Sequence, residues 1–362
     1  MAELLKNIFF TPQSISHLAE TVKRIYPSFV ETRFTGCLYS GLWNDLELKQ
    51  KMRHVSTCLH ECLPDDYIEA VEILEKVAPE IKGFDAMALP DFVEQYGLDH
   101  FDRSLDALAW LTRFSSSEFA IRPFLARDLK KVMDYMYRLA DSEEEWVRRF
   151  SSEGCRPRLP WAQAVPELKK DPSPILPILE KLKNDPSETV RRSVANNLND
   201  ISKDHPELVV ETCRRWKGTS SETDKLIKHA LRTLLKNGNT DALHLFGTAG
   251  TDQIEIISLK LGNQVIRVGE STYFDAIFSN KGPEEIKLRL EYAIYYRKSN
   301  GSLSKKVFQV AEKTCSPGIN SVRRKLSFVE MTTRKLYPGE HHLTFIVNGK
   351  EHEKLSFSLL PA

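Results

Sequence analysis

The sequence predicts a protein in which an all-α repeat domain is followed by an antiparallel β-sandwich. Three observations support this fold class. Apolar residues recur at helical spacing from residue 1 to about 247, and after Gly250 they alternate with polar residues. A Val-Arg-Arg motif also repeats within the helical half. The length of 362 residues and the hydrophobic content of 41% suit two domains that each have a core.

Helical spacing is clearest in two stretches of the first half. One places apolar residues at 71, 73, 74 and 77, and the other at 132, 133, 136 and 139. Helix-ending sequences separate such stretches, for example Asn184-Asp185-Pro186 and Asn237-Gly238-Asn239. We therefore expect residues 1–248 to form one all-α domain.

Two segments of this half repeat each other. EWVRRF at 145–150 aligns with ETVRRS at 188–193, a spacing of 43, and the apolar residues at 190, 194 and 198 realign on those at 226, 230 and 234, a spacing of 36. Such periods are typical of HEAT-type repeats, which stack into a solenoid with a concave groove. Two matching motifs can arise by chance, but the shared acidic residue and apolar ladder favour a true repeat.

The second half has the pattern of a β-sandwich. Apolar residues alternate with polar ones through Leu288–Tyr296 and Leu343–Val347, and turn sequences such as Ser299-Asn300-Gly301 and Asn348-Gly349 lie between such runs. Roughly seven short strands in about 110 residues indicate a sandwich of immunoglobulin type. We assign it residues 252–362.

The net charge is +1, from 51 basic and 50 acidic residues, and such a balance argues against a polyanionic partner. The charges are unevenly distributed, however, because residues 61–110 carry an excess of about ten acidic groups, which the rest of the chain offsets. No signal peptide and no apolar run near 18 residues is present, and six scattered cysteines do not suggest a disulfide framework. We therefore expect a cytoplasmic protein with no membrane contact.

A polar stripe runs along the helix predicted at about 188–203. Arg192, Asn196, Asn199 and Asp200 share one side, opposite the apolar ladder. The 43-residue period places Arg149 on Arg192 and Glu153 on Asn196, so stacked repeats would present guanidinium and carboxylate groups together. The alternative is a set of ordinary surface ion pairs, each worth a few tenths of a kcal/mol.

A stiff basic loop follows Glu153. Gly154 ends a helix, and Pro157 and Pro160 prevent another from starting before Trp161, while Arg156 and Arg158 lie between them. Arginines can take phosphates bidentately and an indole offers a stacking surface, so this loop suits a nucleic-acid backbone. Alternatively, Trp161 packs on the solenoid.

Glu118 follows three serines that could cap a helix, and Pro123 begins a new segment. An acidic residue in a first helical turn is commonly explained by the helix dipole.

Three runs together resemble one known family: EFAIRPFLARD at 118–128, EEEWVRRFSSEGCRPRLPWA at 143–162 and VRRSVANNLNDISKDHP at 190–206. They are similar to the AlkC branch of the AlkC/AlkD-type DNA alkylation-repair glycosylases, some of which carry an immunoglobulin-like domain. The resemblance implies a solenoid that clasps duplex DNA and releases 3-methyladenine and 3-methylcytosine. It also implies active-site carboxylates at Glu118, Glu153 and Asp200, an active-site indole at Trp161 and a DNA-inserting arginine at Arg149.

The chemistry agrees with that assignment. An N3-methylated base is already cationic and leaves without protonation, so ionised carboxylates can stabilise the oxocarbenium-like sugar and orient water. We expect Asp200 to act on the water and sugar, Glu118 and Glu153 to surround the sugar or lesion, and Trp161 to add a cation–π contact. The family also implies access to the lesion by DNA bending, without a base pocket. The arginines that we predict to bind DNA are Arg122, Arg148, Arg149, Arg156, Arg158, Arg191 and Arg192.

We predict no cofactor and no metal, and a monomer acting on alkylated duplex DNA in the bacterial nucleoid. Cys58, His60 and Cys62 are closely spaced metal-type ligands, but no second pair follows them, and burial in a helix explains them better. Two alternatives to the glycosylase are a protein-binding scaffold and a DNA-binding protein without catalysis.

Overall fold

The structure is a computed structural model that describes residues 8–41, 43–247, 252–330 and 335–362. The chain divides into two compact units, one ending at Ala230 and the other starting at Leu231. The short helices α16 (Arg232–Lys236) and α17 (Thr240–His244) are grouped with the strands. Residues 248–251, at the junction predicted from the sequence, lie outside the described residues, so the domain boundaries remain a prediction.

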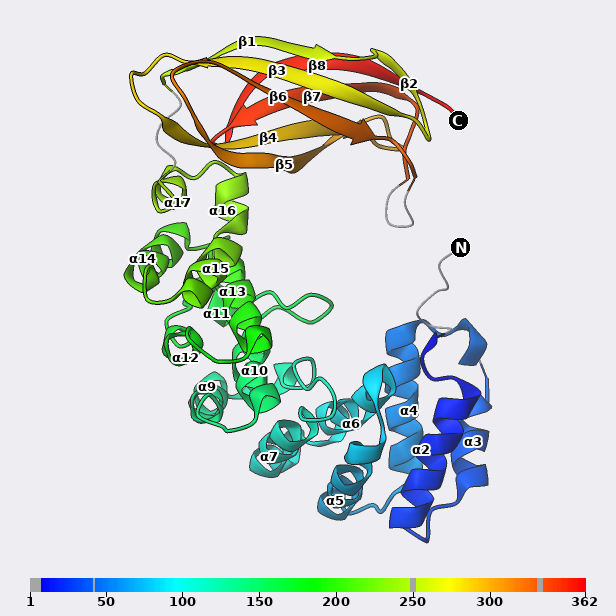
Figure 1. The fold of residues 1–362 in the computed structure, drawn as a ribbon. Coiled ribbons are helices and arrows are strands. Elements are labelled where there is room, and N and C mark those ends of the chain that lie inside the picture. Colours follow the sequence, from blue (N-terminus) through cyan, green and yellow to red (C-terminus); the bar gives the residue numbers. More distant parts are fainter. Residues whose placement is uncertain (1–7, 42, 248–251, 331–334) are drawn as a thin grey trace. The chain divides into compact units, whose positions relative to one another are not determined.

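The first unit is entirely helical, as predicted (Figure 1). The helix pairs α9–α10, α12–α13 and α14–α15 stack in turn, with α10, α13 and α15 forming one layer and α9, α12 and α14 the other. The α-helices of this unit are α2 (Pro12–Ile25), α3 (Glu31–Tyr39), α4 (Leu48–Cys62), α5 (Tyr67–Val77), α6 (Ala88–Tyr96), α7 (Phe101–Leu111), α8 (Arg122–Arg127), α9 (Leu129–Leu139), α10 (Glu145–Gly154), α11 (Pro166–Lys170), α12 (Leu176–Leu182), α13 (Glu188–Ile201), α14 (Pro206–Trp216) and α15 (Ser221–Ala230).

The predicted repeat is present at the level of single hydrogen bonds. Helices α10 and α13 begin at Glu145 and Glu188, the two positions that the 43-residue period aligns. In each helix the first arginine of the Val-Arg-Arg motif donates through Nη1 to the carbonyls five and six residues earlier. For Arg148 these distances are 2.8 and 3.0 Å, and for Arg191 they are 2.9 and 2.6 Å. The same side chain therefore fastens the same turn in both repeats.

The second unit contains two β-sheets, in which all strand pairs are antiparallel except β2 with β8, consistent with the predicted sandwich of immunoglobulin type. One sheet has the order β1-β3-β6 and the other β2-β8-β7-β4-β5, and their facing apolar side chains form a shared core. The predicted turns at Gly301 and at Asn348-Gly349 have positive φ, which Gly and Asn tolerate. The described strands number eight, one more than expected: β1 (Ile254–Leu261), β2 (Val265–Arg267), β3 (Ser271–Asn280), β4 (Ile286–Arg297), β5 (Leu303–Cys315), β6 (Gly318–Ser327), β7 (Gly339–Val347) and β8 (Lys350–Leu360).

The cysteines differ from the expectation in one respect. Cys37 of α3 and Cys58 of α4 form a disulfide, because these two packed helices bring their Cα atoms to 5.9 Å. The sequence pattern did not predict this pairing. The remaining four cysteines are unpaired and buried. Among the described residues, none of the helices combines the length and the hydrophobicity that a membrane crossing requires.

The N-terminal helices support the segment that carries Glu118. Met52 of α4 and Asp91 of α6 line a small cavity together with Ser116 and Phe119. Asp91 is buried, accepts from Gln95 at 2.9 Å and pairs with Arg53 at 3.0 Å. Burial raises the pKa of Asp91 to about 6, against the opposing charge of Arg53.

This raised pKa predicts a pH-dependent stability difference. Because the folded state holds the Asp91 proton more tightly than the unfolded state, its ionisation costs stability as pH rises towards about 6. Relative to the Asp91→Asn variant, the wild type should lose about 1–2 kcal/mol of unfolding free energy between pH 5 and pH 7.5. Urea denaturation of both proteins at the two pH values measures the difference, and parallel pH profiles would contradict the burial argument.

Candidate active site

The site is built around the end of helix α10. Gly154 closes this helix, and a Cβ at that position would lie 3.0 Å from Met136 Cε and 3.3 Å from Phe150 Cε2. Glycine therefore lets the chain pass close to its neighbours as it turns into the loop that runs to α11. The helix end and the stiff loop predicted from Gly154, Pro157 and Pro160 are present in the structure.

Arg156 holds two of the three predicted carboxylates. Its Nη1 donates to Glu153 Oε1 at 2.5 Å, and its Nε and Nη2 both lie 2.8 Å from Asp200 Oδ2. All three side chains are buried, Arg156 at 6% exposure and Asp200 at 3%. Burial alone would lower the pKa of Arg156, but the charges of Glu153 and Asp200 outweigh it and raise the pKa. The guanidinium thus stays charged and keeps both carboxylates together.

The second oxygens of these two carboxylates are also bound. Ser193 Oγ of α13 donates to Glu153 Oε2 at 2.6 Å, and Lys203 Nζ donates to Asp200 Oδ1 at 3.0 Å. Lys203 is half-exposed, so Asp200 lies between a buried guanidinium and a solvent-facing ammonium. Neither partner was predicted from the sequence, although Lys203 follows Asp200 by three residues, a spacing that allows an ion pair.

Glu118 lies in a turn before α8 and not in the first turn of a helix, so the capping and dipole explanation does not apply to it. Helix α8 starts only at Arg122, and Ser115 and Ser117 make no cap. Glu118 is buried and pairs with Arg149 of α10 through Oε1, while Oε2 has no hydrogen-bond partner among the described atoms. Arg149 and Glu153 are four residues apart on α10, so Glu118 faces the helix that carries Glu153.

Trp161 is presented to solvent. Its side chain is 65% exposed, so it does not pack on the solenoid as the alternative interpretation proposed. Its φ of 65° is in the left-handed region, which residues other than glycine and asparagine rarely adopt. Its carbonyl accepts from Lys49 Nζ of α4 at 2.5 Å. The sequence offered no signal for this contact, because the partners are 112 residues apart.

The structure divides the seven arginines that we predicted to bind DNA. Arg122 and Arg156 are buried, Arg122 against the Arg156 carbonyl and Arg156 between Glu153 and Asp200. Arg148 donates two hydrogen bonds to buried Asp185, at 2.6 and 3.0 Å, and Arg191 donates to the carbonyls of its own turn. All four thus have partners within the protein, which favours a structural role, and their contact with DNA stays a prediction.

The other three keep access to solvent. Each also pairs with a carboxylate: Arg149 with Glu118, Arg158 with Asp204 and Arg192 with Glu188. The Arg158 pair, at 2.7 Å, lowers the pKa of Asp204 through its hydrogen bond and raises the pKa of Arg158. Of the arginines predicted to bind DNA, these three are therefore the ones that a phosphate could reach without entering the protein interior.

Arg122 is buried and binds the backbone of the loop that carries Arg156. Its Nη1 donates to the Arg156 carbonyl at 2.8 Å, while Nε and Nη2 have no partner among the described atoms. Burial lowers the pKa of Arg122 to about 10, so it is still a cation at neutral pH. A buried positive charge therefore lies on the inner side of the loop that carries Arg156.

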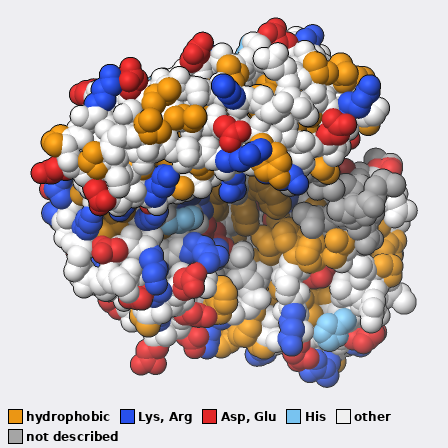
Figure 2. All heavy atoms as spheres, turned by 45° about the horizontal axis from the view of Figure 1, so that its top comes forward, with side chains coloured by type: hydrophobic (Ala, Val, Ile, Leu, Met, Phe, Trp, Pro, Cys, Tyr) orange, Lys and Arg blue, Asp and Glu red, His pale blue; other side chains and the backbone are white. Residues whose placement is uncertain are grey.

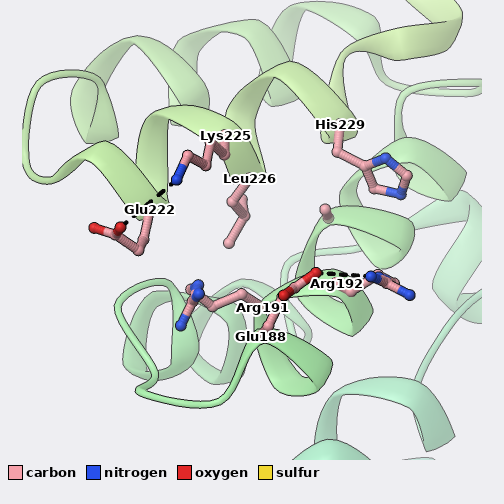
Figure 3. A pocket seen from close by; sticks show the side chains of 8 residues that line it. Glu188, Arg191, Arg192, Glu222, Lys225, Leu226 and His229 are labelled. Atoms are coloured by element: carbon pink, nitrogen blue, oxygen red, sulfur yellow. Dashed lines mark hydrogen bonds and ion pairs between the residues drawn. The ribbon is translucent and has the colours of Figure 1, made fainter.

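A cavity of about 530 Å³ lies between α13 and α15 (Figure 3). Arg191, Arg192, Lys225 and His229 line it with two glutamates, and the pairs Arg192–Glu188 and Lys225–Glu222 span 2.7 and 3.8 Å. Charges of both signs are thus mixed at this surface. Figure 2 shows the same mixture of basic and acidic side chains over the face that it presents.

Metal-type ligands do not gather in the part of the chain that the structure describes, because no three His, Cys, Asp or Glu side chains meet in a way that could hold an ion. Cys58 is bonded to Cys37, and the His60 ring stacks on Tyr96 with 3.8 Å between centroids. These residues serve helix packing.

Comparison with known proteins gives consistent matches over both halves. The family model described as DNA alkylation repair enzyme matches residues 47–235, and the C-terminal Ig-like domain of the uncharacterised protein YhaZ matches residues 255–361. The chain is 45% identical to YhaZ of Bacillus subtilis (strain 168) over 356 residues, which are 98% of this chain and 99% of YhaZ. The solved structure of the Pseudomonas fluorescens alkylpurine DNA glycosylase AlkC, bound to DNA containing an abasic site analog, matches with a TM-score of 0.93 and 38% identity, covering 99% of this chain and 100% of that one.

Proposed function

We propose that this chain, which belongs to the DNA alkylation repair enzyme family, is a DNA glycosylase for cationic N3-alkylated bases in duplex DNA. The single observation that carries the proposal is the buried Glu153–Arg156–Asp200 group, with Glu118 paired to the same helix α10 and an exposed Trp161 in the same loop as Arg156. The AlkC protein of similar structure is an alkylpurine glycosylase bound to DNA, which supports the same class of substrate here.

The chemistry requires only that charge be stabilised. When the N-glycosidic bond breaks, its electron pair moves into the cationic base, which leaves as a neutral molecule and needs no proton. The sugar becomes oxocarbenium-like, and negative carboxylates nearby lower the energy of that state. Water then adds to C1′ and gives up a proton to a carboxylate or to solvent.

Each carboxylate then has its own role in this proposal. Asp200 orients the water and stabilises the sugar, while Glu118 and Glu153 lie around the sugar or the cationic base. The Oε2 atom of Glu118, which has no partner among the described atoms, leaves Glu118 an acceptor for either. Arg156 pairs with both Glu153 and Asp200 and holds the two carboxylates in place.

The lesions would be 3-methyladenine and 3-methylcytosine, and Trp161 would help to recognise their charge. A cation–π contact is worth roughly 0.5–2 kcal/mol. The Trp161→Ala variant should therefore excise these bases about 2- to 30-fold more slowly, and Trp161→Phe should lose less. Single-turnover rates at saturating enzyme measure the effect. An unchanged rate for Trp161→Ala would remove the indole from the site.

An exposed indole suits a lesion that is reached without a closed base pocket. Trp161, at 65% exposure, is not part of an enclosed cavity wall, and Arg149 of α10 would fill the space that a bent duplex opens. We propose that DNA bending gives access to the lesion, that the protein acts as a monomer at the bacterial nucleoid, and that no metal or cofactor takes part.

Backbone binding should depend on the solvent-facing arginines. Replacing Arg192 by glutamine should weaken DNA binding and reduce the slope of log Kd against log salt by about one, because one phosphate contact is lost. Fluorescence anisotropy with undamaged duplex DNA between about 50 and 200 mM salt measures this slope. Lys130→Gln, which alters an exposed pair on α9, is the matched control. A slope equal to that of the wild type would place Arg192 away from DNA.

The test of the function is direct. The protein is incubated with duplex DNA treated with a methylating agent, in excess EDTA, and released bases are separated by chromatography. We expect 3-methyladenine and 3-methylcytosine in the released fraction. DNA binding without release would favour a non-catalytic DNA-binding protein, and the absence of both would favour a protein-binding scaffold.

A further inference from the structure

Lys49 contacts two segments of the proposed site, the loop that carries Trp161 and the turn that carries Glu118, although Lys49 itself lies in neither. It lies in the first turn of α4, and its Nζ donates to the Trp161 carbonyl at 2.5 Å. The same ammonium lies 5.4 Å from the centre of the Phe119 ring, and Phe119 follows Glu118 directly. One exposed side chain of the N-terminal helices thus contacts both the Trp161 loop and the Glu118 turn.

The loop needs such a contact at Trp161. A φ of 65° is sparsely populated for a tryptophan, so surrounding contacts must hold this conformation in place. The neighbouring backbone bonds, Ala162 N to Leu159 O and Val165 N to Pro157 O, are both 3.2 Å and do not include the Trp161 carbonyl. The Lys49 bond does include it.

We propose that Lys49 is a positioning residue that fixes the backbone of Trp161 and thereby the direction of its indole. The consequence for excision rests on the proposed function, whereas the contact itself does not. The alternative is that Lys49 leaves Trp161 and binds a DNA phosphate. The two roles differ in what they change, because positioning affects Trp161 and the excision rate, while a phosphate contact affects DNA affinity and its salt dependence.

The first measurement needs no activity. The chain has five tryptophans, and incorporation of 5-fluorotryptophan gives one fluorine resonance for each, with the Trp161 signal assigned from Trp161→Phe. We expect Lys49→Met to shift or broaden the Trp161 resonance and Lys49→Arg to restore it. Lys130→Met, in an exposed pair on α9, is the matched control and should leave that resonance unchanged. An unmoved Trp161 signal in Lys49→Met would overturn the proposal.

The second measurement is a double-mutant cycle in single-turnover excision. Lys49→Met should slow the maximal rate by no more than Trp161→Ala does, about 2- to 30-fold, with half-saturation and salt slope unchanged. The two changes together should be no slower than Trp161→Ala alone, because Lys49 affects the rate only through the indole, which Trp161→Ala has already removed. Additive losses, or a salt slope reduced by about one, would overturn positioning in favour of phosphate binding.

The two experiments also separate this proposal from the proposed function. If the wild type releases no base but Lys49→Met still moves the Trp161 resonance, the glycosylase assignment fails and the positioning role stands.

Discussion

Replacing Asp200 by asparagine should lower the single-turnover rate of base excision by about a hundredfold or more, with DNA affinity changed less than about threefold. Removing one preorganised group that stabilises developing charge typically costs two to three orders of magnitude in rate. Asp200 is 3% exposed, so loss of its charge should change the binding of the DNA phosphates little. Asparagine keeps the shape and can still accept from Arg156, but it lacks the negative charge that the sugar requires.

A matched control removes a similar ion pair outside the site. Asp204 pairs at 2.7 Å with Arg158, which lies in the same loop as Arg156, but Asp204 is far more exposed than Asp200. Asp204→Asn should therefore excise at close to the wild-type rate. The unfolding free energy of both variants, from urea denaturation, separates lost stability from lost chemistry. Equal losses of rate in the two variants, or an Asp200→Asn defect confined to DNA binding, would remove Asp200 from the chemical step.

The second large effect concerns stability. Arg156→Met should lower the unfolding free energy by about 3–5 kcal/mol, because it leaves Glu153 and Asp200 buried without their cation. The salt slope of DNA binding should not change, since Arg156 is internal. Adding Glu153→Gln and Asp200→Asn to Arg156→Met should restore part of the lost stability, because the uncompensated charges are then gone.

Arg158→Met is the control for Arg156, because its half-exposed pair with Asp204 should be worth at most about 1 kcal/mol. Urea denaturation and anisotropy titrations in salt provide both measurements. If Arg156→Met retained wild-type stability and reduced the salt slope by about one, Arg156 would be a phosphate ligand, as the sequence first indicated.

Much of the fold could be predicted because it repeats. The same arginine at 148 and 191 binds the same two carbonyls of its turn, so one interaction leaves a mark at a 43-residue spacing. Period-two patterns and turn residues such as Asn348-Gly349 likewise indicate the strands of the second unit. The Cys37–Cys58 disulfide was not predicted, because it depends on the packing of two helices and not on a local pattern.

The site was harder to predict because charge in a sequence does not reveal burial. Arg122 at the start of α8 and Arg156 in the basic loop look like phosphate ligands, yet both are internal and bind carbonyls or carboxylates. Glu118 pairs with Arg149 of α10, which is 31 residues away in the sequence. Lys49 and Trp161 are 112 residues apart, and no local pattern links them. A site formed by single contacts between distant residues leaves no periodic pattern in the sequence.

The central claim is that the group around Arg156 hydrolyses an N-glycosidic bond. The most direct test counts two products from the same methylated duplex at stoichiometric protein: free 3-methyladenine plus 3-methylcytosine by chromatography, and abasic sites by alkaline strand cleavage. Hydrolysis predicts that both appear together and in equal number, above the spontaneous release from DNA without protein. A folded, DNA-bound protein that yields neither product above that background would contradict the account.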